Sequence, residues 1–357
     1  MSLEEMTQGI GRLDEAAMQT ARGRQDQLTK PRGSLGRLEE ISIQVAGITG
    51  DPTPRLFNKV VLVMAGDHGV VEEGVSAYPA DVTAQMVLNF LRGGAAINAL
   101  ARQAGARVTV VDMGVASDLA PAAGLVIRKI GGGTRNLARG PAMSRAQAVD
   151  SILAGADVTA AEVLNGADIL ATGDMGIGNT TAAAAIAAAL TGRPAEELAG
   201  RGTGVDEAGL KRKISAIRRG LELNRPEAGD GLDVLSKVGG FEIGGLAGVI
   251  LAAAAHRKPV IIDGFISTAA AMIAVTLAPA ARDYLIAAHV SAEGGHRLML
   301  EWLRLRPLLD LEMRLGEGTG AVLALQLVDA ACRALTDMAT FEEAGVSGKD
   351  GKEQAES

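Results

Sequence analysis

A glutamate between two glycines is the first feature of this sequence that could do chemistry. Glu317 lies in RLGEGTGAVLAL (residues 314–325), with Gly316 and Gly318 beside it and an apolar helical run behind it. The two glycines would each weaken a helix by about 1 kcal/mol relative to alanine, so we expect a loop that ends just after Gly318. A carboxylate there can face a cavity while its backbone passes close to a ligand. The alternative is a negative charge placed near a helix N-terminus, where it is favourable.

A glycine-rich loop earlier in the chain could hold an anion. In TGDMGIGNTTAAAAIAAAL (residues 172–190), three glycines precede Asn179 and Thr180 and a strong helix former; they are Gly173, Gly176 and Gly178. Free N–H groups at a helix start favour a phosphate or a carboxylate. The spacing matches neither GxGxxG nor the P-loop pattern, so the ligand is not defined further. An ordinary glycine turn capped by Asn179 or Thr180 is the alternative.

A second glycine cluster and a serine segment extend this pattern. GRGTGVDEAGLKRK (residues 200–213) places Gly202 and Gly204 before a helix that carries Lys213, which could meet a phosphate as a point charge. The alternative is a solvated basic helix face. HVSAEGGH (residues 289–296) supplies Ser291 at another possible helix start. Its two histidines are too far apart for the HExxH zinc pattern, so no metal site is predicted.

The segment VIIDGFIST (residues 260–268) superficially resembles the loop that holds phosphoribosyl pyrophosphate in ordinary phosphoribosyltransferases. Those loops carry paired acids, whereas here Asp263 is followed by Gly264. If this protein transfers a phosphoribosyl group, its donor need not be a pyrophosphate.

The elements that would position these residues form an α/β pattern. Four aliphatic runs end in polar loops and are followed by helical segments; they are residues 59–69, 107–114, 167–176 and 258–265. Successive units of this kind predict a mostly parallel sheet with helices on both faces. Ligands bind at the carboxyl ends of such strands. Those ends carry Asp67 and His68, Asp112, Asp174, and Asp263.

Helical segments at both ends of the chain predict a small second domain. Residues 3–49 are expected to form helices around a turn at 30–36, and the pattern is helical again after about residue 296. The expected division is 1–55 and 299–342 for the small helical domain, the latter with the Glu317 loop, and 56–298 for the large α/β domain. Residues 343–357 are expected to be a flexible tail.

Composition excludes several classes of protein. The chain has 357 residues, a net charge of -7 and a pI near 5.3, which argues against nucleic acid as a partner. Cys332 is the one cysteine and lies in an apolar run, so no disulfide is expected. The N-terminus has no secretory h-region, and the apolar segments are read as core elements rather than membrane spans. We therefore expect a soluble, cytoplasmic protein.

Seven ordered stretches resemble the family of nicotinate-nucleotide–dimethylbenzimidazole phosphoribosyltransferases, which act in the lower-ligand branch of cobalamin synthesis. They are KPRGSLGRLE (30–39), AGDHGVVEEGVSAYP (65–79), GTRNLARGPAMS (133–144), GDMGIGNTT (173–181), DVLSKVGGFEIGGLAG (233–248), IIDGFIS (261–267) and RLGEGTGA (314–321). They cover roughly residues 25–340, nearly the whole chain. Long ordered matches of this kind are specific, whereas one glycine motif is not.

The resemblance implies a fold, a reaction and an assembly. It implies a Rossmann-like sheet domain, a small helical domain from both termini, and a homodimer whose active site the neighbouring subunit completes. The reaction transfers the phosphoribosyl group of β-nicotinate mononucleotide to 5,6-dimethylbenzimidazole, giving α-ribazole 5′-phosphate and nicotinate with inversion at the anomeric carbon. Glu317 would be the general base that takes the benzimidazole proton. No cofactor is implied.

The resemblance also implies site residues. Asp174 would share the catalytic site; family members often have glutamate there, so its shorter side chain leaves its contact with the ribose or base open. Residues implied for the nucleotide and its phosphate are Gly176, Gly178, Asn179, Gly202, Gly204, Lys213, Asp263 and Ser291. Tyr78, Gln85 and Met86 lie where the aromatic base is expected, and they are equally interpretable as ordinary helix-face residues.

The sequence is compatible with two alternative functions. One keeps the donor and the mechanism but uses another acceptor, such as adenine, a different benzimidazole or a phenol. The other is a non-catalytic nucleotide-binding protein on the same scaffold, which would tolerate loss of Glu317.

Overall fold

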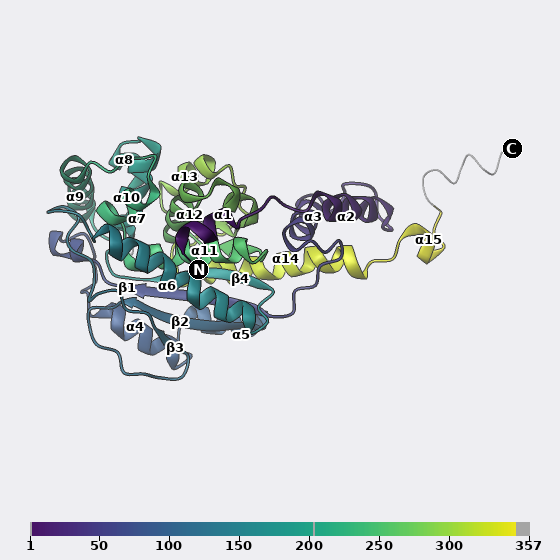
Figure 1. Cartoon of the computed structure of the whole chain (residues 1–357), viewed down its shortest axis with the longest axis horizontal. Coiled ribbons are helices and arrows are strands. Elements are labelled where there is room, and N and C mark those ends of the chain that lie inside the picture. Colours follow the sequence, from purple (N-terminus) through teal and green to yellow (C-terminus); the bar gives the residue numbers. More distant parts are fainter. Residues whose placement is uncertain (1, 203, 348–357) are drawn as a thin grey trace. The chain divides into compact units, whose positions relative to one another are not determined.

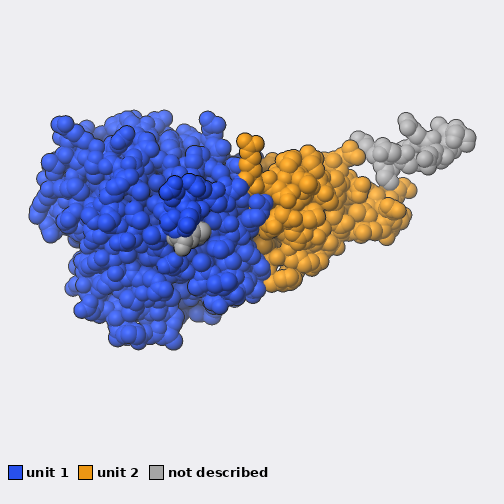
Figure 2. Space-filling model, viewed as in Figure 1, with its two compact units in different colours: residues 1–11, 58–325 blue, residues 12–57, 326–357 orange. Residues whose placement is uncertain are grey.

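The computed structural model describes residues 2–202 and 204–347, which form two compact units (Figure 2). The large unit comprises Met1–Gly11 and Asn58–Leu325, and the small unit comprises Arg12–Phe57 and Gln326–Ser357.

A six-stranded parallel sheet is the centre of the large unit (Figure 1). Its strands are β1 (Lys59–Gly66), β2 (Ala106–Gly114), β3 (Leu125–Ile127), β4 (Ile169–Met175), β5 (Val260–Ile262) and β6 (Leu285–Ala287). They lie in the order β3-β2-β1-β4-β5-β6, and every pairing is parallel. This is the strand order of a doubly wound fold, in which the order of successive strands changes direction between β1 and β4 while the strands stay parallel. The predicted fold class is confirmed, and β3 and β6 are additions to it.

Helices cover both faces of the sheet, which is why its strands are continuous apolar runs. α4 (Val82–Leu91) and α5 (Ala96–Ala104) lie on one face, while α6 (Arg145–Leu164), α11 (Phe241–Ala255) and α12 (Phe265–Leu277) lie on the other (Figure 1). α6 and α11 cross through glycines: a Cβ on Gly155 would lie 1.9 Å from the carbonyl oxygen of Gly245. Many of the glycines therefore serve close helix packing as well as turns.

The remaining elements of the large unit connect these layers. They are α1 (Leu3–Gln8), the 3₁₀ turn η1 (Gly69–Glu73), α7 (Asn179–Thr191), α8 (Ala195–Leu198), α9 (Glu207–Asn224), α10 (Gly231–Val238), the 3₁₀ turn η2 (Pro279–Tyr284), α13 (His296–Leu303), and a separate two-stranded parallel ribbon of β7 (His289–Val290) and β8 (Leu309–Asp310).

The small unit is helical and contains α2 (Glu15–Gln27), α3 (Arg37–Thr49), α15 (Phe341–Ala344) and the later part of α14 (Thr319–Asp337). Ala21, Ala46 and Leu335 form a buried cluster that joins the N-terminal and C-terminal segments. Arg24 donates to the carbonyls of Leu335 and Met338 at 2.8 and 3.0 Å, which satisfies acceptors at the end of α14.

The observed division differs from the expected boundaries at both ends. Residues 1–11 belong to the large unit, where the hydroxyl of Tyr284 donates to the carbonyl of Gly11 at 3.1 Å. Residues 299–325 also belong to it, because the Glu317 loop packs on β4. Of the expected tail, residues 343 and 344 end α15, and residues 348–357 lie outside the described residues.

The helix α14 has the length and composition that a membrane span would need, among the residues that the structure describes. Just over half of its apolar window, 56%, is buried inside the protein, as in the core helix of a globular domain. Cys332 on this helix is buried.

Candidate active site

The loop that carries Glu317 lies directly on the end of β4. Gly316, Glu317 and Gly318 have φ values of +88°, +64° and +89°, a run of left-handed residues that glycine on either side makes possible. The N–H of Glu317 donates to the carbonyl of Asp174 at 3.2 Å. A Cβ on Gly173 would lie 2.5 Å from the carbonyl oxygen of Glu317, so the close approach requires glycine there as well.

Asp263, at the end of β5, anchors this loop. Its Oδ2 accepts the N–H of Gly318 at 3.1 Å and its Oδ1 accepts the N–H of Ala321 at 2.9 Å, so it caps the first turn of α14. Burial raises the pKa of Asp263, while the nearby His289 and the backbone N–H groups act in the opposite direction. Asp263 was predicted in the nucleotide site; in this structure it shapes the Glu317 loop and does not line the pocket described below.

The Glu317 carboxylate meets the first turn of α5. Its side chain is buried, and Oε2 accepts the N–H of Ile97 at 3.3 Å in the first turn of α5. Burial raises the pKa of Glu317 and the charge of Asp263 raises it further, while the Ile97 N–H lowers it. A raised pKa makes a carboxylate a stronger base near neutral pH, as a general base requires.

Asp174, near the end of β4, is a second buried acid and lies next to the Glu317 loop. Its Oδ2 accepts from the side-chain amide of Asn179 at 2.9 Å. Burial raises the pKa of Asp174 well above its usual value, and the charges of Asp263 and Glu242 add to the effect. The site therefore holds two acids with different environments: Asp174 bonds a side chain, whereas Glu317 faces a helix N-terminus.

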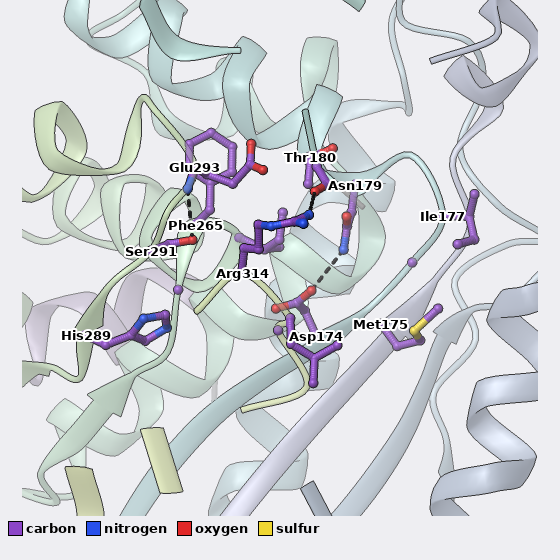
Figure 3. Close-up of a pocket in the computed structure, with 16 residues that line it drawn as sticks. Asp174, Met175, Ile177, Asn179, Thr180, Phe265, His289, Ser291, Glu293 and Arg314 are labelled. Carbon is purple, nitrogen blue, oxygen red and sulfur yellow. Dashed lines mark hydrogen bonds between the residues drawn. The ribbon is translucent and has the colours of Figure 1, made fainter. Parts of the chain in front are cut away.

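A pocket of about 610 Å³, counted out to the solvent at its mouth, opens beside Asp174 (Figure 3). Its walls come from the end of β4 and the loop after it, from the start of the helix after β5, and from Gly202 and the segments 289–293 and 314–316. Ligands are expected at this carboxyl edge of a doubly wound sheet. The lining residues predicted from sequence are Asp174, Gly176, Asn179, Gly202 and Ser291; those that sequence reasoning did not assign include Met175, Phe265, His289, Glu293 and Arg314. Two of the missed residues had a usable signal, since Arg314 opens the RLGEG segment and Glu293 lies within the HVSAEGGH segment, two residues after Ser291.

Ser291 is held by a buried histidine. The N–H of Ser291 donates to Nδ1 of His296 at 2.7 Å, so Nε2 of that ring carries the proton and donates to Oγ1 of Thr268 at 2.8 Å. The Thr268 hydroxyl donates in turn to the carbonyl of Gly264 at 2.8 Å. Burial lowers the pKa of His296 to about 3, consistent with a neutral ring. This chain of bonds joins two pocket segments, those of Ser291 and Gly264.

Lys213 lies immediately behind the lining. Its Nζ donates to Oγ1 of Thr180 at 2.9 Å and to the carbonyl of Gly200 at 3.0 Å, and burial lowers its pKa. The side chain is almost fully buried, so it is not part of a solvated basic face. Gly178, with φ +94°, is the N-cap of α7, and Gly204, with φ +114°, turns the chain after Gly202; neither lines the pocket.

The three residues predicted to bind the base lie outside this lining. Tyr78 is half exposed, Gln85 is exposed and Met86 is partly exposed. The helix of the latter two, α4, is tied to the glycine loop by Thr83, whose hydroxyl accepts the N–H of Ile177 at 3.1 Å.

A pocket lined by the buried Asp174, with the buried Glu317 on the adjoining loop but outside the lining, lies at the carboxyl edge of a doubly wound sheet, where α/β proteins bind their ligands. A family model described as "Phosphoribosyltransferase" matches residues 10–346. Two relatives, from Roseiflexus sp. (strain RS-1) and Desulforudis audaxviator (strain MP104C), are 63% and 62% identical to this chain; the matches cover 97% and 95% of it and 98% and 96% of the relatives. Both are named nicotinate-nucleotide–dimethylbenzimidazole phosphoribosyltransferase.

A solved structure supports the same family. The crystal structure of CobT from Thermus thermophilus is similar with a TM-score of 0.90 at 53% identity, covering 93% of this chain and 99% of that one. The chain is therefore an enzyme of the phosphoribosyltransferase class. It belongs to the nicotinate-nucleotide–dimethylbenzimidazole phosphoribosyltransferase family.

Proposed function

We propose that this enzyme transfers the phosphoribosyl group of β-nicotinate mononucleotide to 5,6-dimethylbenzimidazole and releases nicotinate. The observation that carries the proposal is the buried carboxylate of Glu317, held on a loop of left-handed residues that bonds to Asp174 at the pocket wall. Membership of the family supports the choice of substrates.

The donor would lie along the pocket with its phosphate toward Gly176, Gly202 and Ser291. Backbone N–H groups at the start of α7 favour an anion at this end. Arg314 adds a cation, and its Nη1 donates to the carbonyl of Gly202 at 3.0 Å. Lys213 lies behind the same segment and adds a second positive charge through the loop that it supports.

The reaction balances without an added metal. The bond between the anomeric carbon and the pyridinium nitrogen of the donor breaks, and its electron pair neutralises that nitrogen, so nicotinate leaves readily. The unprotonated nitrogen of dimethylbenzimidazole forms the new bond on the opposite face, which inverts the anomeric carbon. Glu317 takes the proton from the other ring nitrogen, and a base positioned in this way contributes about 10²–10⁴-fold.

The acceptor would bind beside Glu317, with Tyr78, Gln85 and Met86 on the side facing it. We propose a cytoplasmic homodimer in which the partner subunit completes this part of the site. Exposed apolar side chains on the α4 side of the large unit, Tyr78 at 50% and Leu88 at 42%, support a covered surface there.

The first experiment is to incubate the purified enzyme with β-nicotinate mononucleotide and 5,6-dimethylbenzimidazole and to follow both products by chromatography. We expect nicotinate and α-ribazole 5′-phosphate to appear in equal amounts, with and without a chelator. Turnover with adenine or a phenol but not with dimethylbenzimidazole would replace the acceptor. Donor binding without turnover for any acceptor would point to a non-catalytic nucleotide-binding protein.

A further inference from the structure

A buried acid lies at the end of the pocket that would receive the donor phosphate. Glu293 lines the pocket, is only 6% exposed, and has an Oε2 atom with no hydrogen-bond partner among the described residues. Figure 3 shows its carboxylate on the Arg314 side of the pocket. A carboxylate is an unexpected lining for a phosphate site, because two anions in one cavity repel each other.

The Glu293 carboxylate interacts with the same positive groups that would hold a bound anion. It packs on the Cα of Gly200, where an added Cβ would lie 1.8 Å from Oε2. Three groups favour its charged form: Lys213, the backbone N–H of Gly202, and Arg314. Burial acts against them and is the largest influence, so the pKa of Glu293 is raised overall.

The buried ammonium of Lys213, directly behind the pocket, compensates the charge of Glu293. Lys213 is buried and donates hydrogen bonds to neutral oxygens, those of Thr180 and Gly200. The charge of Glu293 offsets part of the cost of burying this ammonium, which otherwise lowers its pKa. The other charged or titratable groups that face the same cavity are Arg314, Asp174 and His289.

We propose that Glu293 is an internal anion that occupies the phosphate end of the pocket and competes with the donor phosphate. Binding of a tetrahedral dianion then requires Glu293 to take up a proton or to withdraw. Glu293 is thus a residue that limits donor affinity and favours release of the phosphorylated product. This inference rests on the proposed donor site and adds a coupling between anion binding and protonation.

The sign of the coupling follows from the charges. A bound dianion raises the pKa of Glu293 further, so the anion binds more tightly to the protonated form. Affinity for the anion therefore falls as the pH rises from the pKa of the free enzyme toward that of the complex. Removing the charge with Glu293→Gln, which keeps the shape of the side chain, should abolish this part of the pH dependence.

The test uses inorganic sulfate and inorganic phosphate on the wild-type enzyme, on Glu293→Gln and on a control, Glu301→Gln. Glu301 is an exposed acid on the nearby helix α13, so its variant removes one charge without touching the pocket. Sulfate is a dianion throughout the range, so any proton taken up on binding belongs to the protein. Calorimetric titrations between about pH 5.5 and 8.5 in two buffers of different ionisation enthalpy count that proton.

We expect proton uptake on sulfate binding to the wild-type enzyme and to Glu301→Gln, and none to Glu293→Gln. At about pH 8, Glu293→Gln should bind both anions at least about tenfold more tightly than the wild type. The wild-type proton count tests the proposal even if Glu293→Gln folds poorly, which thermal melting would reveal.

Three results would overturn the proposal, and they are distinguishable. Equal affinities with no proton uptake, or uptake that persists in Glu293→Gln, would reduce Glu293 to a counterion of Lys213. Failure of both anions to bind any of the three proteins would remove the phosphate site itself, and the donor placement with it.

Discussion

The backbone N–H of Glu317 donates to the backbone carbonyl of Asp174 at 3.2 Å. This bond brings together two buried acids that are far apart in the sequence. The same loop is fixed by Asp263, whose two carboxylate oxygens accept backbone N–H groups of the loop and of α14. The position of the proposed base therefore depends on two neighbouring strand ends, those of β4 and β5.

Replacing the proposed base should reduce turnover without unfolding the protein. We expect Glu317→Gln to lower kcat by at least about 100-fold with little change in donor binding, because the amide cannot accept the acceptor's proton. Glu317→Asp keeps the charge but shortens the side chain, so its kcat should lie between those of the wild type and Glu317→Gln. Steady-state kinetics with thermal melting as a folding control checks this, and near wild-type turnover of Glu317→Gln would exclude the general-base role.

The raised pKa of Glu317 should appear in the pH profile. Only the deprotonated carboxylate can take a proton, so kcat should fall as the pH drops through that pKa, at a pH above the usual glutamate value of 4.5. Measuring kcat against pH for the wild type and Glu317→Gln checks the assignment. If kcat falls at low pH with the same midpoint in both proteins, the titrating group is not Glu317.

The charge of Asp174 should cost stability at neutral pH. Its folded-state pKa is raised well above 3.8, so the folded state binds the proton more tightly and stability falls as the pH rises above 3.8 toward the raised pKa. Asp174→Asn keeps an acceptor for Asn179 and removes the charge. We expect it to melt higher than the wild type at about pH 8, by roughly 2–4 °C for each kcal/mol gained, with a difference that shrinks toward acid pH. A lower melting temperature for Asp174→Asn across the whole range would contradict this interpretation.

Replacing Asp263 should reduce both stability and kcat, whereas replacing an acid that caps an ordinary turn should reduce stability alone. Asp263→Asn leaves a buried N–H group of the loop or of α14 without an acceptor, which costs about 1–3 kcal/mol, and it should also displace Glu317 and lower kcat. Asp112→Asn is the matched control, because the Asp112 carboxylate accepts the N–H of Val115 at a buried turn outside the pocket lining. Denaturant unfolding and kinetics together separate the two effects: equal losses of kcat in both variants would count against a positioning role for Asp263.

The glycine after the base should be irreplaceable. In Gly318→Ala the new Cβ would lie 2.9 Å from Cγ1 of Val61 at φ +89°, so about 1–3 kcal/mol of overpacking adds to the left-handed penalty of about 1–2 kcal/mol. Gly105 also has a left-handed φ, +64°, but an added Cβ would have no atom within 4 Å. Gly105→Ala should therefore lose stability only through the left-handed penalty. Chemical denaturation of both variants measures the difference, and equal losses would show that the contact with Val61 relaxes freely.

The sequence determined the sheet and the chemistry of its edge, because those signals are local. Continuous apolar runs such as residues 59–66 need burial on both faces, and the polar residues that end them must meet at one edge of a parallel sheet. Gly316 and Gly318 likewise indicate a loop around Glu317 from the sequence alone. Short strands such as Leu285–Ala287 were missed because three residues carry too little periodicity.

Tertiary structure alone decided which polar residues act together. Asp112 and Asp263 end strands in the same way, yet Asp112 caps a turn while Asp263 holds the Glu317 loop, because only the strand order places β5 beside β4. The contacts of His296 and Glu293 were likewise not predicted, since they depend on residues that the fold brings against them, Thr268 for His296 and Lys213 for Glu293, rather than on their neighbours in the chain. Burial and long-range contact set a side chain's pKa and partners, and neither is encoded within a few residues of sequence.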